Sequence, residues 1–263
     1  MTASPDFAAL WPVADALADA ARAETLAHFR ATDLAAESKQ ADFDPVTEAD
    51  RAAERAMRAV LARERPDDGI TGEEYGATPS TTGVTWILDP IDGTRGYLAG
   101  TPTWGTLIAA ADADGPKLGI VDQPWTGERF SGGAGRAGMT GPGGARTLAT
   151  RGPRPLQEAI LFTTFPEVGS DEEGAAFRRV ASDVRLIRYG MDCYAYALLA
   201  MGCIDLVIEA GLQVYDIAAP MAVVEAAGGI VTDWTGGSAT AGGRVIAAAN
   251  AEVHGRALER LGA

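Results

Sequence analysis

The spacing of hydrophobic and polar residues predicts two helices near the start of the chain. Apolar side chains recur at helical spacing over residues 5–30 and again over residues 47–65. Pro66 and the turn after it end the second helix, because proline cannot continue the backbone hydrogen-bond ladder. Short β-rich runs follow, and they predict strands at 84–88, 104–111 and 117–121.

The second half of the chain alternates strand and helix patterns. Strands are predicted at 159–165, 184–188, 205–209 and 230–233, and helices at 172–182, 192–202 and 217–227. This alternation indicates a layered α/β architecture. The Gly- and Pro-rich stretch 131–144 either separates an N-terminal half, 1–140, from a C-terminal half, 141–263, or forms a hairpin and an exposed loop.

Charge and cysteine content narrow the classes of function. The 263 residues carry a formal net charge of −14, and so acidic a surface repels nucleic acid and anionic membranes. The N-terminus lacks the basic and apolar regions of a signal peptide, and no apolar stretch is long enough for a membrane span. If Cys193 and Cys203 both lie on the helix predicted near 192–202, they are roughly 15 Å apart along its axis and cannot form a disulfide. We therefore expect a reduced, cytoplasmic protein.

Four acidic residues stand where a carboxylate is costly or unusual. Asp89 directly follows the apolar strand 84–88, Asp92 comes after a proline turn, Glu73 lies in a loop, and Asp216 opens an apolar helix. Clustered carboxylates repel one another unless a cation neutralises them. Oxygen ligands without a nearby His or Cys favour Mg²⁺, Mn²⁺ or Ca²⁺ over Zn²⁺.

The turn after Asp92 adds a site for an anion. Gly93 allows a ligand to approach the backbone closely. The N–H groups of Gly93 and Thr94, at a predicted helix start, would point at a phosphate. A cation site and a phosphate cradle therefore fall within six residues, Asp89 to Thr94.

These motifs resemble the inositol monophosphatase family. The matching segments are Asp44 to Asp50 with Lys39 upstream, Gly72-Glu73-Glu74, Trp86 to Thr94, and Tyr215 to Ala219. They follow the order and spacing of the family over almost the whole chain. The resemblance implies an α-β-α-β-α sandwich, a homodimer, and two to three Mg²⁺ ions for which Mn²⁺ is a possible substitute.

The resemblance also implies a role for each matching residue. Glu73, Asp89 and the Ile91 carbonyl would hold a first Mg²⁺, and Asp89, Asp92 and Asp216 a second. Asp50 and Glu73 would help to place a third ion and the attacking water, which a hydrogen-bonded pair of Thr94 and Asp50 would activate. Asp92, Gly93 and Thr94 would contact the substrate phosphate. A plain structural reading stays open for Asp50 and Asp216, because both stand where a helix-capping residue is expected.

The substrate is predicted from residues outside the metal site. Segments 96–109, 122–129 and 188–197 resemble the histidinol-phosphatase branch of the family. Histidinol phosphate carries an amine and an imidazole, so carboxylates in its pocket would favour it over a neutral polyol. Asp192 and Glu209 align with substrate-contacting positions of the family, although Asp192 is also a candidate helix cap. Arg188 either orients the substrate or pairs with an acid.

The expected activity is therefore hydrolysis of L-histidinol phosphate, a step of histidine biosynthesis. Two alternatives remain. One is a phosphatase for inositol 1-phosphate or other sugar phosphates. The other is a regulatory member of the family that does not need catalysis.

Overall fold

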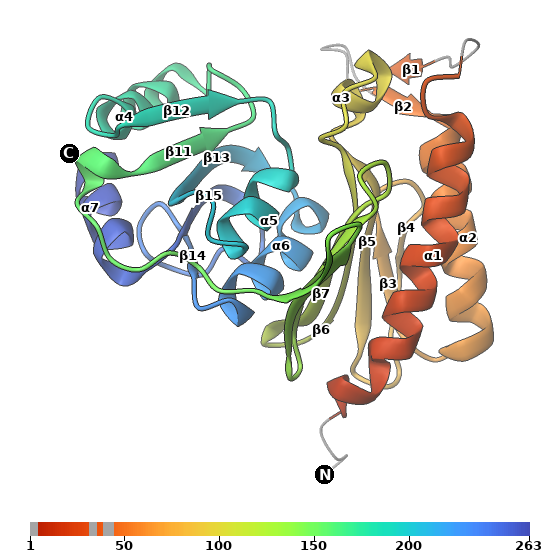
Figure 1. Ribbon diagram of the computed structural model, residues 1–263. Helices are drawn as coiled ribbons and strands as arrows, with labels where there is room; N and C mark the ends of the chain where they lie inside the picture. Colours follow the sequence, from red (N-terminus) through yellow and green to blue (C-terminus); the bar gives the residue numbers. More distant parts are fainter. Residues whose placement is uncertain (1–4, 32–35, 39–44) are drawn as a thin grey trace.

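The computed structural model describes residues 5–31, 36–38 and 45–263 (Figure 1). Lys39 and Asp44, which belong to the motif of the resemblance, lie outside these residues. Strands β1 (Ala36–Ser38) and β2 (Pro45–Thr47) form a small antiparallel ribbon. Within the described part of the chain, no helix is both long and apolar enough to cross a membrane.

The two predicted N-terminal helices are confirmed, with a short 3₁₀ turn (Phe7–Leu10) before the first of them. They are α1 (Trp11–His28) and α2 (Glu48–Glu64). Helix α2 starts at a capping box, in which the Thr47 hydroxyl accepts the Ala49 N–H at 3.1 Å and the Asp50 carboxylate accepts the Thr47 N–H at 2.8 Å. These bonds satisfy backbone donors that the first turn of a helix leaves unpaired.

Helices α1 and α2 cover one face of an eight-stranded sheet. Its order is β10-β9-β8-β7-β6-β5-β3-β4, with only β3 and β5 parallel. The stretch 131–144 lies within successive hairpins of this sheet, one of the two interpretations that the sequence left open. The strands are β3 (Gly69–Gly72), β4 (Gly76–Thr78), β5 (Thr85–Asp92), β6 (Gly105–Asp112), β7 (Gly115–Gln123), β8 (Glu128–Gly133), β9 (Arg136–Gly141) and β10 (Gly144–Thr147).

A second, five-stranded sheet is built from the C-terminal part of the chain. Its order is β12-β11-β13-β15-β14, and the strands are β11 (Ile160–Thr163), β12 (Leu186–Tyr189), β13 (Leu206–Leu212), β14 (Ile230–Asp233) and β15 (Gly243–Ala248). The helices are α3 (Thr94–Ala99), α4 (Asp171–Ala181), α5 (Tyr194–Ala200), α6 (Val214–Ala226) and α7 (Ala251–Leu261), with a 3₁₀ turn at Leu156–Glu158. Because α5 ends at Ala200, Cys203 lies beyond the helix that was expected to carry both cysteines, and both thiols are free.

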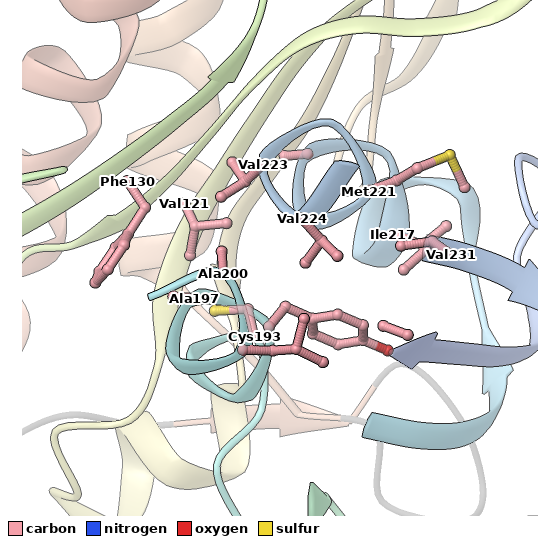
Figure 2. Packing of buried hydrophobic residues seen from close by; sticks show 14 of the residues in the cluster. Val121, Phe130, Cys193, Ala197, Ala200, Ile217, Met221, Val223, Val224 and Val231 are labelled. Carbon is pink, nitrogen blue, oxygen red and sulfur yellow. The ribbon is translucent and has the colours of Figure 1, made fainter. Parts of the chain in front are cut away.

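The layers follow the order α-β-α-β-α, which confirms the predicted fold. Helices α5 and α6 lie between the two sheets, and α4 and α7 cover the outer side of the small sheet (Figure 1). Figure 2 shows the apolar core between the sheets, where Val121 and Phe130 of the large sheet face α6 side chains such as Val223. Helix α6 belongs to the predicted C-terminal half but packs on the sheet of the N-terminal half, so both halves share this core.

Two glycines let α6 approach the large sheet. A Cβ atom at Gly132 would lie 2.4 Å from the Val223 Cα, and one at Gly119 would lie 2.5 Å from the Ala219 carbonyl oxygen. These neighbours are helix backbone, which cannot turn away as a flexible side chain can.

We expect Gly132→Ala to lower the free energy of unfolding by about 1–3 kcal/mol, because the added methyl overpacks the core. Denaturant unfolding measures the effect. Gly138→Ala in β9 is the matched control, since its nearest neighbour would lie 3.4 Å away. Equal stability of the two variants would contradict this account of the packing.

Candidate active site

Three carboxylates converge where β5 meets α6. Each of Asp89, Asp92 and Asp216 offers an oxygen, and these oxygens all lie within 4.8 Å of one another. The pairing of β5 with β6 shifts register between Asp89 and Asp92, around Pro90, which has no N–H to donate. Asp216 sits in the first turn of α6, where its Oδ2 accepts the Gln213 N–H at 2.6 Å. Asp216 therefore caps its helix and also joins the cluster.

Asp89 is the most deeply placed of the three. Burial raises the pKa of Asp89 well above its ordinary value, and neighbouring carboxylates, with Glu73 the strongest, raise it further. Its Oδ1 atom is buried and has no hydrogen-bond partner within the described chain. A buried carboxylate oxygen that has no hydrogen-bond partner and is surrounded by like charges is energetically unfavourable unless a cation binds it.

Asp92 links the cluster to the start of α5. Its Oδ2 accepts the Cys193 N–H at 2.6 Å. Burial raises the pKa of Asp92 well above its ordinary value, the charges of Asp192 and Asp216 raise it further, and the Cys193 bond acts in the opposite direction. The carboxylate thus lies between the acidic cluster and the residues of the C-terminal half.

Glu73 is an electrostatic neighbour of both Asp50 and Asp89. Burial raises the pKa of Asp50 to about 6, hydrogen bonds from Thr47 oppose the rise, and the charge of Glu73 adds to it. Contact with Glu73 likewise raises the pKa of Asp89. Glu73 therefore connects Asp50 electrostatically to the cluster of Asp89, Asp92 and Asp216.

The expected hydrogen bond between Thr94 and Asp50 is not formed in this structure. The Thr94 hydroxyl donates to the Ile91 carbonyl at 3.0 Å. Asp50 Oδ2 accepts both the N–H and the hydroxyl of Thr47, the latter at 2.6 Å. Each group has a partner close to it in the sequence, and such short-range bonds compete well with a distant one. The Ile91 carbonyl, which was also proposed as a metal ligand, accepts this hydrogen bond from the Thr94 hydroxyl.

A cavity of about 630 Å³ opens above the cluster between the two halves of the chain. Residues from both halves line it, among them Glu73, Asp92 and Asp216. Of the lining residues in the described chain, Arg95 alone is basic, and its guanidinium stacks on Phe165 with 5.0 Å to the ring centre. The cavity is therefore strongly acidic.

Asp192 and Glu209 line the same cavity. Glu209 Oε2 accepts the Tyr196 hydroxyl at 2.8 Å, and its Oε1 accepts the Thr164 N–H at 3.1 Å. Asp192 Oδ2 accepts the Thr103 hydroxyl at 3.4 Å. Burial raises the pKa of Asp192 to about 6, and the charge of Glu209 adds to the rise. Burial also raises the pKa of Glu209.

Gly93 has two steric reasons to be glycine. Its φ is +83°, in the left-handed region that other residues avoid, and it directly precedes α3. A Cβ there would also lie 2.7 Å from the Asp192 Cγ atom. Gly93 thus lets Asp192 lie directly against the Asp89-to-Thr94 turn.

Arg188 is not brought to this site. It is exposed on the edge strand β12 and does not line the cavity. Conversely, Tyr196 of α5 is a buried aromatic residue whose place in an apolar helix indicates only packing, but its hydroxyl also holds Glu209 at the cavity wall. Asp192 precedes Cys193, the capping position of α5, so the simple capping interpretation of Asp192 does not hold.

The donor set fits a hard divalent cation. The ligand atoms available are carboxylate oxygens, and one of them, Asp89 Oδ1, is buried without a partner. Oxygen-only sites of this kind suit Mg²⁺ or Mn²⁺. The cluster is therefore able to hold a metal ion.

The raised pKa values predict how the stability of the metal-free protein depends on pH. The pKa values of Asp50 and Asp192 rise from an ordinary 3.8 to about 6 on folding. Between these values the folded state holds protons that the unfolded state has released, so stability falls as the pH rises through the window. We expect the melting temperature in a chelator to fall by about 10 °C across it.

The control for this prediction is the double variant Asp50→Asn, Asp192→Asn, which lacks both titrations. Its melting temperature should change less over the same pH range. Identical pH profiles of the two proteins would contradict the assignment of these two groups.

Comparison with known proteins identifies the class of this protein. A model of the inositol monophosphatase family matches residues 8–263, almost the whole chain. The chain belongs to the inositol monophosphatase family. It is accordingly a phosphatase, with the acidic cluster at the centre of its candidate active site.

Similar proteins include enzymes with different names. The chain is 37% identical to a histidinol-phosphatase of Mycobacterium tuberculosis, over 94% of this chain and 96% of that protein. It is 43% identical to the chloroplastic bifunctional phosphatase IMPL2 of Arabidopsis thaliana, over 84% of this chain and 66% of that protein. A solved inositol monophosphatase from Zymomonas mobilis is 40% identical with a TM-score of 0.84, covering 96% of this chain and 97% of that one.

Proposed function

We propose that this phosphatase hydrolyses L-histidinol phosphate to L-histidinol and phosphate, a step of histidine biosynthesis, with Mg²⁺ as its cofactor. The observation that carries the substrate assignment is the pair Asp192 and Glu209. Both carboxylates line the cavity beyond the acidic cluster; Glu209 is held by hydrogen bonds from Thr164 and Tyr196, and Asp192 accepts one from Thr103. The similarity to a histidinol-phosphatase supports the same substrate.

Glu73, Asp89, Asp92 and Asp216 would hold the metal, with Asp50 beside them. Bound Mg²⁺ makes a coordinated water easier to deprotonate and neutralises charge on the phosphoryl oxygens. The N–H groups at Gly93 and Thr94 would orient the phosphate at the start of α3. Asp50, with its pKa raised to about 6, is able to take up a proton near neutral pH, as a general base must.

The leaving group is selected by charge. An amine or imidazolium placed between Asp192 and Glu209 would relieve the repulsion between these two acids, because a cation there stabilises both charged forms. A neutral polyol offers hydroxyl groups but no charge. We therefore expect kcat/KM for histidinol phosphate to exceed that for inositol 1-phosphate by about 10–100-fold, the value of a charge-assisted hydrogen bond.

The test is a panel of phosphomonoesters assayed for phosphate release at one Mg²⁺ concentration. The panel comprises histidinol phosphate, inositol 1-phosphate and glucose phosphate. Equal turnover of the first two would reject the histidinol assignment and favour a broader sugar phosphatase. Absence of turnover on every ester with Mg²⁺ present would favour a regulatory role without catalysis. A homodimer and a cytoplasmic location also stay predictions.

A further inference from the structure

Glu54 is a fully buried acid that the sequence did not single out. It lies on α2 one helical turn after Asp50, among the buried residues of that helix. Its carboxylate forms an ion pair with Arg58 at 2.8 Å, from Oε1 to Nε. Desolvating a buried charge costs free energy, so a carboxylate at this position must be compensated by an ion pair and hydrogen bonds.

The Glu54 carboxylate binds the loop that carries Glu73. Oε2 accepts the Glu74 N–H at 2.7 Å, and Oε1 accepts the Tyr75 N–H at 3.2 Å. On the other side, the Glu73 N–H donates to the Leu88 carbonyl of β5 at 3.2 Å. The backbone is therefore held immediately before and after the Glu73 side chain, by β5 and by Glu54.

Gly72 makes room for this arrangement. A Cβ atom at residue 72 would lie 2.0 Å from Glu54 Oε1 and 2.5 Å from its Cδ. Gly72 ends β3, so the loop leaves the strand directly over the Glu54 carboxylate. The glycine of the Gly72-Glu73-Glu74 motif thus has a steric cause in α2, and any side chain there would push the carboxylate away from the loop.

We propose that Glu54 is a positioning residue that fixes Glu73 beside Asp89 and thereby sets the affinity of the site for a divalent cation. The inference rests on the metal site of the proposed function. Glu54 does not line the cavity in the described chain, and both of its oxygens accept hydrogen bonds, so it acts through the loop. Groups that orient metal ligands in this way commonly change metal affinity by 10–100-fold when they are removed.

The test is the variant Glu54→Gln, which keeps the shape of the side chain but replaces one acceptor oxygen by an NH₂ group. That group faces a backbone N–H, so at least one bond to the loop is lost. Calorimetric titration of the chelator-treated protein with Mg²⁺ should show a dissociation constant raised by about tenfold or more. Phosphate release at saturating Mg²⁺ should recover most of the wild-type rate, because Glu54 does not touch the substrate.

Asp68→Asn is the matched control. Asp68 lies just before the opposite end of β3 and is also a buried acid paired with an arginine, since Arg65 Nε lies 2.7 Å from its Oδ2. This variant should lose stability and keep the wild-type Mg²⁺ affinity. Gly72→Ala is a second, independent variant, which should weaken Mg²⁺ binding although Glu54 is still present.

The possible results distinguish the role of Glu54 from the existence of the metal site. Unchanged Mg²⁺ affinity in Glu54→Gln, or equal weakening in Asp68→Asn, would overturn the role of Glu54 while the metal site stands. A wild-type protein that binds no Mg²⁺ in the titration would overturn the metal site and this inference with it.

Discussion

Asp89→Asn is expected to lower kcat/KM by about 10³-fold or more while raising the melting temperature of the metal-free protein. Asp89 is buried among other acids, and one of its oxygens has no partner in the described chain. If it is a metal ligand, its loss removes an interaction worth several kcal/mol in the transition state. Without metal, the same change removes a buried charge that its neighbours repel.

The two effects are measured separately. Phosphate release is followed at saturating Mg²⁺, and thermal unfolding is followed in a chelator, where the variant should melt about 3 °C or more above the wild type. Asp205→Asn is the control, because Asp205 is equally buried but is paired with Arg151 at 3.0 Å. That control should melt at a lower temperature. Turnover of Asp89→Asn within tenfold of the wild type would contradict the site.

Asp192→Asn is expected to reduce the preference for histidinol phosphate over inositol 1-phosphate by about 10–100-fold, the value of one charge-assisted hydrogen bond. Asp192 has a φ of +47°, in the left-handed region. Asparagine tolerates this conformation, so the substitution removes charge with little change of backbone. The loss should fall on histidinol phosphate and leave inositol phosphate turnover similar.

The measurement is kcat/KM for both esters at one pH and one Mg²⁺ concentration. Thr103→Val serves as the control, because it removes the 3.4 Å hydrogen bond to Asp192, together with a 3.3 Å bond between the Thr101 and Thr103 hydroxyls, and keeps the carboxylate. It should retain most of the selectivity. A parallel fall for both esters in Asp192→Asn would mean that Asp192 acts on the shared phosphate chemistry and does not recognise the leaving group.

The parts of the fold with strong periodicity could be predicted from the sequence. Helix α2 has an apolar stripe, a capping residue at Thr47 and a terminating Pro66, and its predicted and observed bounds agree closely. By contrast, β9 and β10 are largely exposed hairpin strands, so they show little of the alternation that marks a half-buried strand.

The acidic cluster could be predicted because its members interrupt apolar segments. Asp89 follows a buried strand and Asp216 starts a buried helix, and both positions are unfavourable for a carboxylate without a ligand. The partners of individual atoms could not be predicted in the same way. Thr94 donates to Ile91 and Asp50 accepts from Thr47, and the sequence alone does not show which of several possible acceptors or donors each side chain meets.

Glu54 and Tyr196 show a further limit. Glu54 stands four residues after Asp50 on the buried face of α2, a spacing that could have marked it, but helical charged residues usually face solvent. Tyr196 stands in an apolar helix, which indicates packing, and the role of its hydroxyl depends on the position of Glu209 on another element. Contacts between side chains of different elements depend on the tertiary structure, and the hydrophobic pattern of one segment does not predict them.

The most direct test of the central claim is metal-dependent phosphate release from histidinol phosphate by the wild-type protein. Protein stripped with a chelator should release no phosphate above background, and added Mg²⁺ should restore turnover in a saturable manner. Full activity in the chelator, or no activity at any Mg²⁺ concentration, would contradict a metal-dependent phosphatase built on Asp89, Asp92 and Asp216.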